Sequence, residues 1–267
     1  MKQKKVKLYA SEKKGPLGLP FGLSGSALKW IAIVTMLLDH IGACVIAEYM
    51  MNSSGFAAYQ GYAGLSYEQK MFWYNAYYVL RYIGRLAFPI FCFLLVEGFS
   101  HTRDVKKYAL RLGLFCLISE IPFDLAFRGA LFNWNYQNVF FTLLLGLLGI
   151  WGMEYFKKKG TWPLGVLCMA AAAVAAELLH TDYGAFGVIV IALLYLFHQN
   201  RWLQVASGVI AILIYGGMEM WGSLAFLPIL LYDGSRGKQP KYFFYIFYPA
   251  HLLILTAVGY WILPLLM

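Results

Sequence analysis

The sequence predicts an all-α, polytopic transmembrane helix bundle of about nine spans, with its N-terminus in the cytoplasm. Of its 267 residues, 61% are hydrophobic and only 13% are charged. Soluble globular domains are about 45–50% apolar and about 25% charged, so the composition departs in both directions towards a membrane protein. Aromatic residues make up 18% of the chain, which suits packed bundles and the aromatic belts at membrane interfaces.

Nine apolar segments support this fold class. A transmembrane helix needs about 20 consecutive, mainly apolar residues. By that rule the predicted spans, in order, are 28–48, 78–99, 106–127, 137–156, 162–179, 184–198, 202–217, 221–232 and 242–264. The sixth to eighth segments are short and could be tilted or partly re-entrant, so eight to ten spans are compatible with the sequence.

The distribution of Lys and Arg predicts the orientation. The cations before or at the start of the first span are Lys2, Lys4, Lys5, Lys7, Lys13, Lys14 and Lys29. Every second connection after it is basic: "SHTRDVKK", "KKKGT", "HQNRW" and "DGSRGKQPK". The connections on the other side contain only Lys70 and Arg128 as cations. This is the positive-inside pattern, so we expect residues 1–27 to be a basic cytoplasmic arm and 28–267 a single transmembrane domain.

Several classes of protein are disfavoured. The net charge of +9 lies in loops, where it sets topology, so no nucleic-acid partner is expected. The four cysteines lie singly in apolar runs, and we predict neither a disulfide framework nor a metal site. No Walker motif, GxGxxG or repeated half-structure is present, which weakens the ATPase, redox and transporter interpretations.

Ionisable residues inside the apolar segments are the functional candidates. A charge at the bilayer centre costs at least about 2.5–3.5 kcal/mol, so such groups face the bundle interior. The candidates are Asp39, His40, Arg81, Arg85, Glu97, Arg111, Glu120, Asp124, Glu177 and His251. Two pairs have i, i+4 spacing on neighbouring spans: Arg81 with Arg85, and Glu120 with Asp124. A structural interpretation is equally open, in which Arg85 pairs with Glu120 or Asp124 and fixes helix packing.

His40 stands out because it follows Asp39 near the middle of the first span. Adjacent helical residues point about 100° apart, so Asp39 can pair with Arg81 or Arg85 while His40 faces a cavity. An imidazole titrates near neutral pH and is the natural proton acceptor for an amine or hydroxyl nucleophile. The alternative is a core histidine hydrogen-bonded to an Asp or a Tyr. Three prolines, Pro89, Pro122 and Pro249, interrupt spans near these polar groups and make room for a cavity.

The motifs resemble those of the TraX family over most of residues 27–258. The resemblance is carried by "LKWIAIVTMLLDHIGA", "RYIGRLAFPIFCFLLVEGFSHTRDVKKYALRLGLFCLISEIPFDLAF", "NVFFTLLLGL", "DYGAFGV" and "FYPAHLLIL". The founding member N-acetylates the amino terminus of pilin, and the family looks related to a wider group of membrane acyltransferases. The resemblance implies a multi-pass protein of the bacterial cytoplasmic membrane, in contact with membrane lipid. It also implies transfer of an acetyl group from cytoplasmic acetyl-CoA to an amine or hydroxyl acceptor, a peptide or a glycan, reached from the extracytoplasmic side.

The resemblance also implies roles for residues. His40 corresponds to the intramembrane base, and the other catalytic candidates are Asp39, Arg85 and Glu120. We expect Asp39 to orient His40, and Arg85 or Arg81 to stabilise an oxyanion. The predicted substrate and cofactor contacts are Arg81, Arg103, Lys106, Lys107, Arg111, Asp124 and His251, with the four cations from Arg103 to Arg111 placed to bind the phosphates of acetyl-CoA. Direct transfer and a transient acyl-histidine both remain open.

Two rival functions belong to other classes. A small-solute or proton-coupled transporter could use the same buried groups as a relay; it would show solute flux without acyl-CoA. A membrane scaffold or immunity protein that binds a peptide partner would need the buried charges only for helix packing, and it would tolerate loss of His40.

Overall fold

The computed structural model describes residues 22–51, 65–238 and 243–262, and these form helices and connections without a sheet. Residues 1–21, most of the predicted basic arm, lie outside the described residues. The elements are α1 (Gly25–His40), η1 (Ile41–Met51), α3 (Tyr67–Gly84), α4 (Ala87–His101), α5 (Val105–Arg128), α6 (Val139–Lys158), α7 (Trp162–Leu178), α8 (Gly184–Leu196), α9 (Arg201–Tyr215), η2 (Gly217–Ala225), α10 (Phe226–Leu230), α11 (Phe243–Ala257) and η3 (Val258–Ile262).

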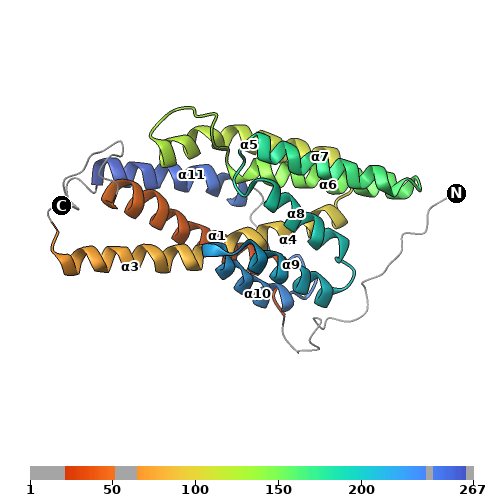
Figure 1. Cartoon of the computed structure of the whole chain (residues 1–267), viewed down its shortest axis with the longest axis horizontal. Coiled ribbons are helices and arrows are strands. Elements are labelled where there is room, and N and C mark those ends of the chain that lie inside the picture. The colour runs from red at the N-terminus through yellow and green to blue at the C-terminus, as the bar shows by residue number, and fades with distance from the viewer. Residues whose placement is uncertain (1–21, 52–64, 239–242, 263–267) are drawn as a thin grey trace.

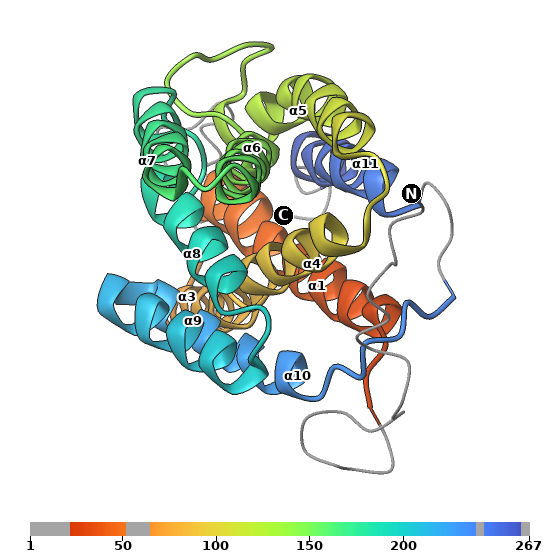
Figure 2. The same ribbon diagram turned by 90° about the vertical axis from the view of Figure 1, so that its right-hand side faces the viewer.

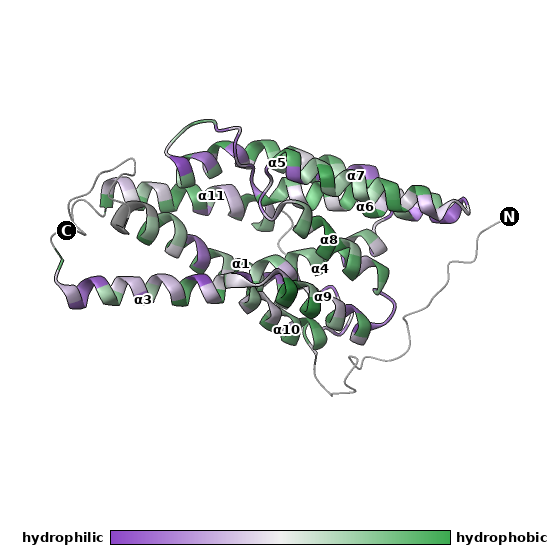
Figure 3. Ribbon diagram, viewed as in Figure 1, coloured by the Kyte–Doolittle hydropathy of each residue, from purple (hydrophilic) through white to green (hydrophobic). Residues whose placement is uncertain are grey.

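The helices run roughly along one long axis (Figure 1). Seen down that axis, α1 and α4 lie in the middle (Figure 2). On one side are α5, α6, α7 and α11, and on the other are α3, α9 and α10, while α8 packs against α4, α6, α7 and α9. The helices are mainly hydrophobic, and hydrophilic residues gather at the connections (Figure 3). The arrangement is that of a helical membrane protein.

Within the part of the chain that the structure describes, four helical stretches are long and apolar enough to cross a membrane: Gly25–Ala47, Tyr67–His101, Val139–Lys158 and Phe243–Ile262. Shorter apolar helices are Trp162–Leu178, Gly184–Leu196 and Arg201–Tyr215. The prediction of an all-α bundle with several membrane spans is therefore confirmed. The count of nine spans and the cytoplasmic N-terminus stay predictions.

Two segments differ from the sequence prediction. The predicted span 78–99 is part of a longer helical pair, because α3 begins at Tyr67 behind a capping box formed by Ser66 and Gln69. The predicted span 221–232 is not a continuous α-helix but the 3-10 helix η2 followed by the short α10. Gly216 and Gly217 at its start have φ of 79° and 59°, which only glycine adopts without strain.

Among the described residues, two hydrophobic clusters form the core. One is centred on α4, α6 and α8, with Phe93 and Leu147 among its fully buried members. The other joins α1, α5 and α11, where Ile33 and Leu252 are buried. The helices are irregular between the clusters: α1 gives way to the π-helix η1 directly after His40, and α3 is separated from α4 by a break at Arg85. π-Helical turns are frequent at functional sites.

Candidate functional site

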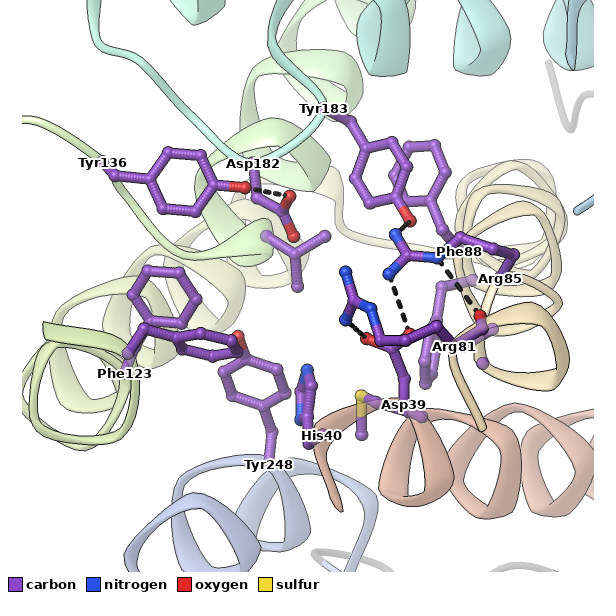
Figure 4. A pocket seen from close by; sticks show the side chains of 16 residues that line it. Asp39, His40, Arg81, Arg85, Phe88, Phe123, Tyr136, Asp182, Tyr183 and Tyr248 are labelled. Carbon is purple, nitrogen blue, oxygen red and sulfur yellow. Dashed lines mark hydrogen bonds and ion pairs between the residues drawn. The ribbon is translucent and has the colours of Figure 1, made fainter. Parts of the chain in front are cut away.

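A cavity of about 110 Å³ lies where the two hydrophobic clusters meet. Sixteen residues from α1, α3, α4, α5, α6, α11 and the connections before α6 and α8 line it (Figure 4). Its polar wall consists of Asp39, His40, Arg81 and Arg85, and Asp182 lies across the cavity from them. Its aromatic wall consists of Phe88, Phe91, Phe123, Phe127, Tyr136, Tyr183 and Tyr248. A space of this size holds small reacting groups and a few waters, not a whole cofactor-sized molecule.

Asp39 is held between two arginines on the polar wall. Its Oδ2 lies 2.7 Å from Arg81 Nη1 and its Oδ1 lies 2.8 Å from Arg85 Nη2. Arg85 also donates from Nη1 to Glu219 Oε1 at 2.7 Å and to the Tyr183 hydroxyl at 3.3 Å. The four charges balance, and none of these side chains is more than 20% exposed. The prediction that Asp39 pairs with Arg81 or Arg85 is confirmed for both.

The two arginines differ in how many of their hydrogen-bond donors are already used. Arg85 uses its Nε on the Arg81 carbonyl oxygen at 3.4 Å and both terminal nitrogens on side chains. Arg81 Nε is buried and has no hydrogen-bond partner among the described residues. Figure 4 shows the Arg81 guanidinium between Asp39 and the open middle of the cavity, on the side of His40. Arg81 is therefore the arginine with donor capacity for a bound group.

The close approach of α1 and α3 depends on Gly84. A Cβ at this position would overlap the Cβ and Oδ1 of Asp39. The missing side chain lets α3 bring Arg81 and Arg85 against α1, so a single glycine sets the distance between Asp39 and its two partners.

His40 is 9% exposed and lies beside this ion cluster. Its Nδ1 is 2.6 Å from Nε2 of His251, and the two rings are parallel to within 3° with centroids 4.9 Å apart, so the hydrogen bond joins them edge to edge. Phe127 and Tyr248 present their edges to the His40 ring. His251 does not line the cavity but lies behind His40, where its Nδ1 is 2.8 Å from the Phe247 carbonyl oxygen.

Asp182 forms the opposite wall, with the Tyr136 hydroxyl donating to its Oδ1 at 2.7 Å. Asp182 lies in the connection between α7 and α8. This connection is paired with the one before α6, through the Gln137 amide to the His180 carbonyl at 3.0 Å and the Asp182 amide to the Gln137 carbonyl at 2.9 Å. No described residue donates to the other oxygen, Oδ2.

Glu120 and Asp124 do not pair with Arg85, so that structural interpretation is wrong. Glu120 Oε2 accepts hydrogen bonds from the backbone amide of Asn138, at 3.4 Å, and from its side-chain Nδ2. Asp124 Oδ2 accepts from the Asn133 amide at 2.6 Å. Neither residue lines the cavity. The two carboxylates instead hold the 129–138 connection on α5.

The four cations predicted to bind phosphates lie at the other end of α5. Lys106, Lys107 and Arg111 are exposed on its first two turns, and Arg103 is exposed just before it. Asp104 caps the helix, and the backbone amide of Lys107 lowers the pKa of its carboxyl group. From Lys107 to Phe123 the helix rises about 24 Å, at 1.5 Å per residue. None of the four lines the cavity.

The remaining candidates have structural partners. Glu97 lies 3.8 Å from Arg201 Nη2 and 3.8 Å from His101 Nδ1 at the predicted inner end. Glu177 accepts a hydrogen bond from the Ala185 amide at the start of α8. Among the described residues, no group of three or more His, Cys, Asp or Glu side chains could hold a metal ion.

Sequence reasoning missed four cavity or cluster residues: Tyr136, Asp182, Tyr183 and Glu219. All four lie in connections or in η2, where no periodicity points inward. All four lie in three stretches that contain at least two other polar or glycine residues, "NWNYQN", "HTDYG" and "GGMEMW". The sequence offered Asp39, Glu120 and Asp124 on the helices as partners for the two arginines, so nothing in it indicated that connections supply Asp182 and Glu219.

The cavity therefore places a base, a cation and a carboxylate around one small space. His40 can take a proton, Arg81 can donate to a developing negative charge, and Asp182 can accept from a bound donor. The aromatic wall lowers the local dielectric, which strengthens each of these interactions.

Comparison with known proteins finds a matching family model and a curated relative. The family model described as TraX protein matches residues 24–259. A curated relative, the probable fimbrial assembly protein FimC, serogroup H1, of Dichelobacter nodosus, is 30% identical over 260 residues, which cover 88% of this chain and 95% of the relative. No solved structure matches the chain.

Proposed function

The chain belongs to the TraX family, and we propose that it is an integral-membrane acyltransferase that moves an acetyl group from acetyl-CoA to an amine or hydroxyl. The observation that carries the proposal is the juxtaposition of His40 with Arg81 at one small cavity (Figure 4). A general base next to a cation with a spare donor is what acyl transfer needs, because the nucleophile loses a proton as the carbonyl oxygen gains charge.

In the proposed step, the acceptor nitrogen or oxygen attacks the thioester carbonyl carbon. A C–N or C–O bond forms and the C–S bond breaks. His40 takes the proton of the acceptor and returns it to the leaving thiolate, so that CoA leaves as the thiol. Arg81 donates to the oxyanion of the tetrahedral intermediate. Asp39 holds Arg81 in place, and Arg85 holds Asp39.

The size of the cavity decides how the donor binds. About 110 Å³ admits an acetyl thioester end but not the nucleotide. We therefore propose that the phosphates bind outside the bundle, at Arg103, Lys106, Lys107 and Arg111, which suit phosphate recognition. The pantetheine arm would then extend between the start of α5 and the cavity. We expect this end of α5 to face the cytoplasm of a bacterial cell, as the positive-inside pattern predicts.

The acceptor would enter from the opposite side. An amine would direct one N–H at His40 and its second N–H at Asp182 Oδ2, whereas a hydroxyl would direct its single O–H at His40. The relative is named for fimbrial assembly, and this favours a peptide acceptor, a fimbrial subunit, over a glycan. The aromatic wall suits the apolar stem of such a segment.

The test is acetyl transfer by the purified protein in lipid nanodiscs. With [¹⁴C]acetyl-CoA and a set of peptide amines, the wild-type protein should release CoA thiol and label an acceptor. His40→Ala should lower turnover by about 10³-fold, as loss of a general base does. The matched control is His101→Ala, whose side chain is exposed at the predicted inner end, and it should behave as wild type.

Two results would overturn the proposal. One is wild-type turnover in His40→Ala at a normal level of folded protein. The other is solute flux through reconstituted liposomes without CoA release, which would favour a transporter.

A further inference from the structure

His40 is backed by a chain of two hydrogen bonds that ends on the main chain. Its Nδ1 lies 2.6 Å from His251 Nε2, and His251 Nδ1 lies 2.8 Å from the Phe247 carbonyl oxygen. Phe247 is four residues before His251 on α11, so the second bond stays within one turn of a single helix. Phe247 and His251 also stack, with ring centroids 4.8 Å apart. The His251 ring is therefore fixed from two sides.

The end of this chain determines where the protons are. A carbonyl oxygen can only accept, so His251 Nδ1 must carry the hydrogen. In a neutral imidazole the other nitrogen is then an acceptor, so His251 Nε2 presents a lone pair. The bond between the rings consequently needs the hydrogen on His40 Nδ1. His40 Nε2 then carries no hydrogen and presents its lone pair.

A charged ring would allow another arrangement, but the surroundings disfavour it. His251 is 4% exposed and His40 is 9% exposed. Among the described residues no carboxylate contacts either ring, and the nearest acid along the chain, Asp39, is already bound by Arg81 and Arg85. A buried charge without a partner is expensive, so both rings are neutral at rest.

We infer that His251 is a positioning residue that fixes His40 as the Nδ1–H tautomer and so keeps His40 Nε2 free to take a proton. The tautomer follows from the two contacts alone, whereas the catalytic consequence rests on the proposed acyltransferase function. The inference also changes the sequence-based role of His251, which was predicted as a substrate or cofactor contact. His251 acts through His40 and not on the substrate.

The tautomer can be measured without any assay of activity. The full-length protein, labelled with ¹⁵N and ¹³C histidine and reconstituted in lipid bilayers, is studied by solid-state NMR near neutral pH. The signals of His40 are assigned by their loss in His40→Ala. We expect His40 to show a protonated Nδ1 and an unprotonated Nε2. A neutral histidine in water prefers the opposite tautomer, so the result is diagnostic.

Two substitutions separate hydrogen bonding from packing. His251→Phe keeps an aromatic ring beside Phe247 but removes the acceptor; His40 should change to the Nε2–H tautomer, and kcat should fall about 10²-fold with KM unchanged. His251→Gln offers an amide oxygen as the acceptor; His40 should keep Nδ1–H, and kcat should stay within about threefold of wild type. His101→Gln serves as the control, because its side chain is 71% exposed.

The outcomes distinguish this inference from the proposed function. A protonated Nε2 on His40 in the wild-type spectrum would overturn the inference, as would equal loss of kcat in the Phe and Gln variants. An Nδ1–H tautomer in a protein that transfers no acetyl group would support the tautomer assignment and overturn the acyltransferase function. If His251→Phe does not fold, the wild-type spectrum and the His251→Gln variant still test the tautomer of His40.

Discussion

Two pairs of ionisable residues with the same i, i+4 spacing lie on opposite sides of the bundle and have different roles. Arg81 and Arg85 point at Asp39 and line the cavity. Glu120 and Asp124 lie on α5 and accept hydrogen bonds from the connection that follows it. The first pair is arranged around an open space, and the second holds a loop in place.

The difference teaches that the partner, and not the spacing, decides the role of a buried charge. The arginines have two carboxylates to balance them and one spare donor, so a bound group can complete the set. The two acids on α5 instead accept hydrogen bonds from Asn133 and Asn138 in the connection that follows. Three substitutions test this contrast, from the largest expected effect to the smallest.

Removing Arg85 should unfold the site. Arg85→Met leaves Asp39 with one partner and Glu219 with none that is described, so the free energy of unfolding should fall by about 3–5 kcal/mol, the usual effect of breaking a buried pair. The measurement is denaturant unfolding in detergent micelles. Glu120→Gln is the matched control: its amide oxygen still accepts from Asn138, and the loss should be below about 1 kcal/mol. Equal losses in the two variants would remove the contrast.

Removing Arg81 should affect turnover more than stability. In Arg81→Met, Asp39 still has Arg85, but the oxyanion loses its donor. We expect kcat to fall by about 10²–10³-fold, as in other sites where one such donor is lost. Glu120→Gln in the same assay should stay within about threefold of wild type, although the sequence placed Glu120 among the catalytic residues. Normal turnover in Arg81→Met would show that Arg81 does not stabilise the oxyanion.

A substitution where α1 and α3 approach closely should have the smallest effect on the free energy of unfolding. Gly84→Ala puts a methyl group against Asp39 and should lower the free energy of unfolding by about 1–3 kcal/mol, as overpacking does. Gly113→Ala on α5 is the matched control, because a Cβ there would meet only Leu144 at an ordinary 3.7 Å. It should be neutral or stabilise by up to about 1 kcal/mol through helix propensity. Both are read from unfolding curves, and destabilisation by Gly113→Ala alone would contradict the packing argument.

The sequence predicted the parts of the molecule that depend on local pattern. Apolar length located the helices, and the cost of burying charge singled out Asp39, His40 and Arg85, which do meet at one cavity. It could not predict that Asp182 and Glu219 join them, because both lie in short polar connections whose path depends on packing. It also failed to separate Glu120 from the site, since a carboxylate that anchors a loop has the same sequence signature as a catalytic one.

The central claim is that the His40 cavity is the place of acetyl transfer, and a structure of the protein with CoA bound in a lipid bilayer tests it most directly. The account predicts the CoA sulfur within about 4 Å of His40 Nε2, the distance of a near-attack geometry, with the phosphates at the start of α5. A sulfur bound elsewhere, or a cavity that stays closed to CoA at saturating concentration, would contradict it.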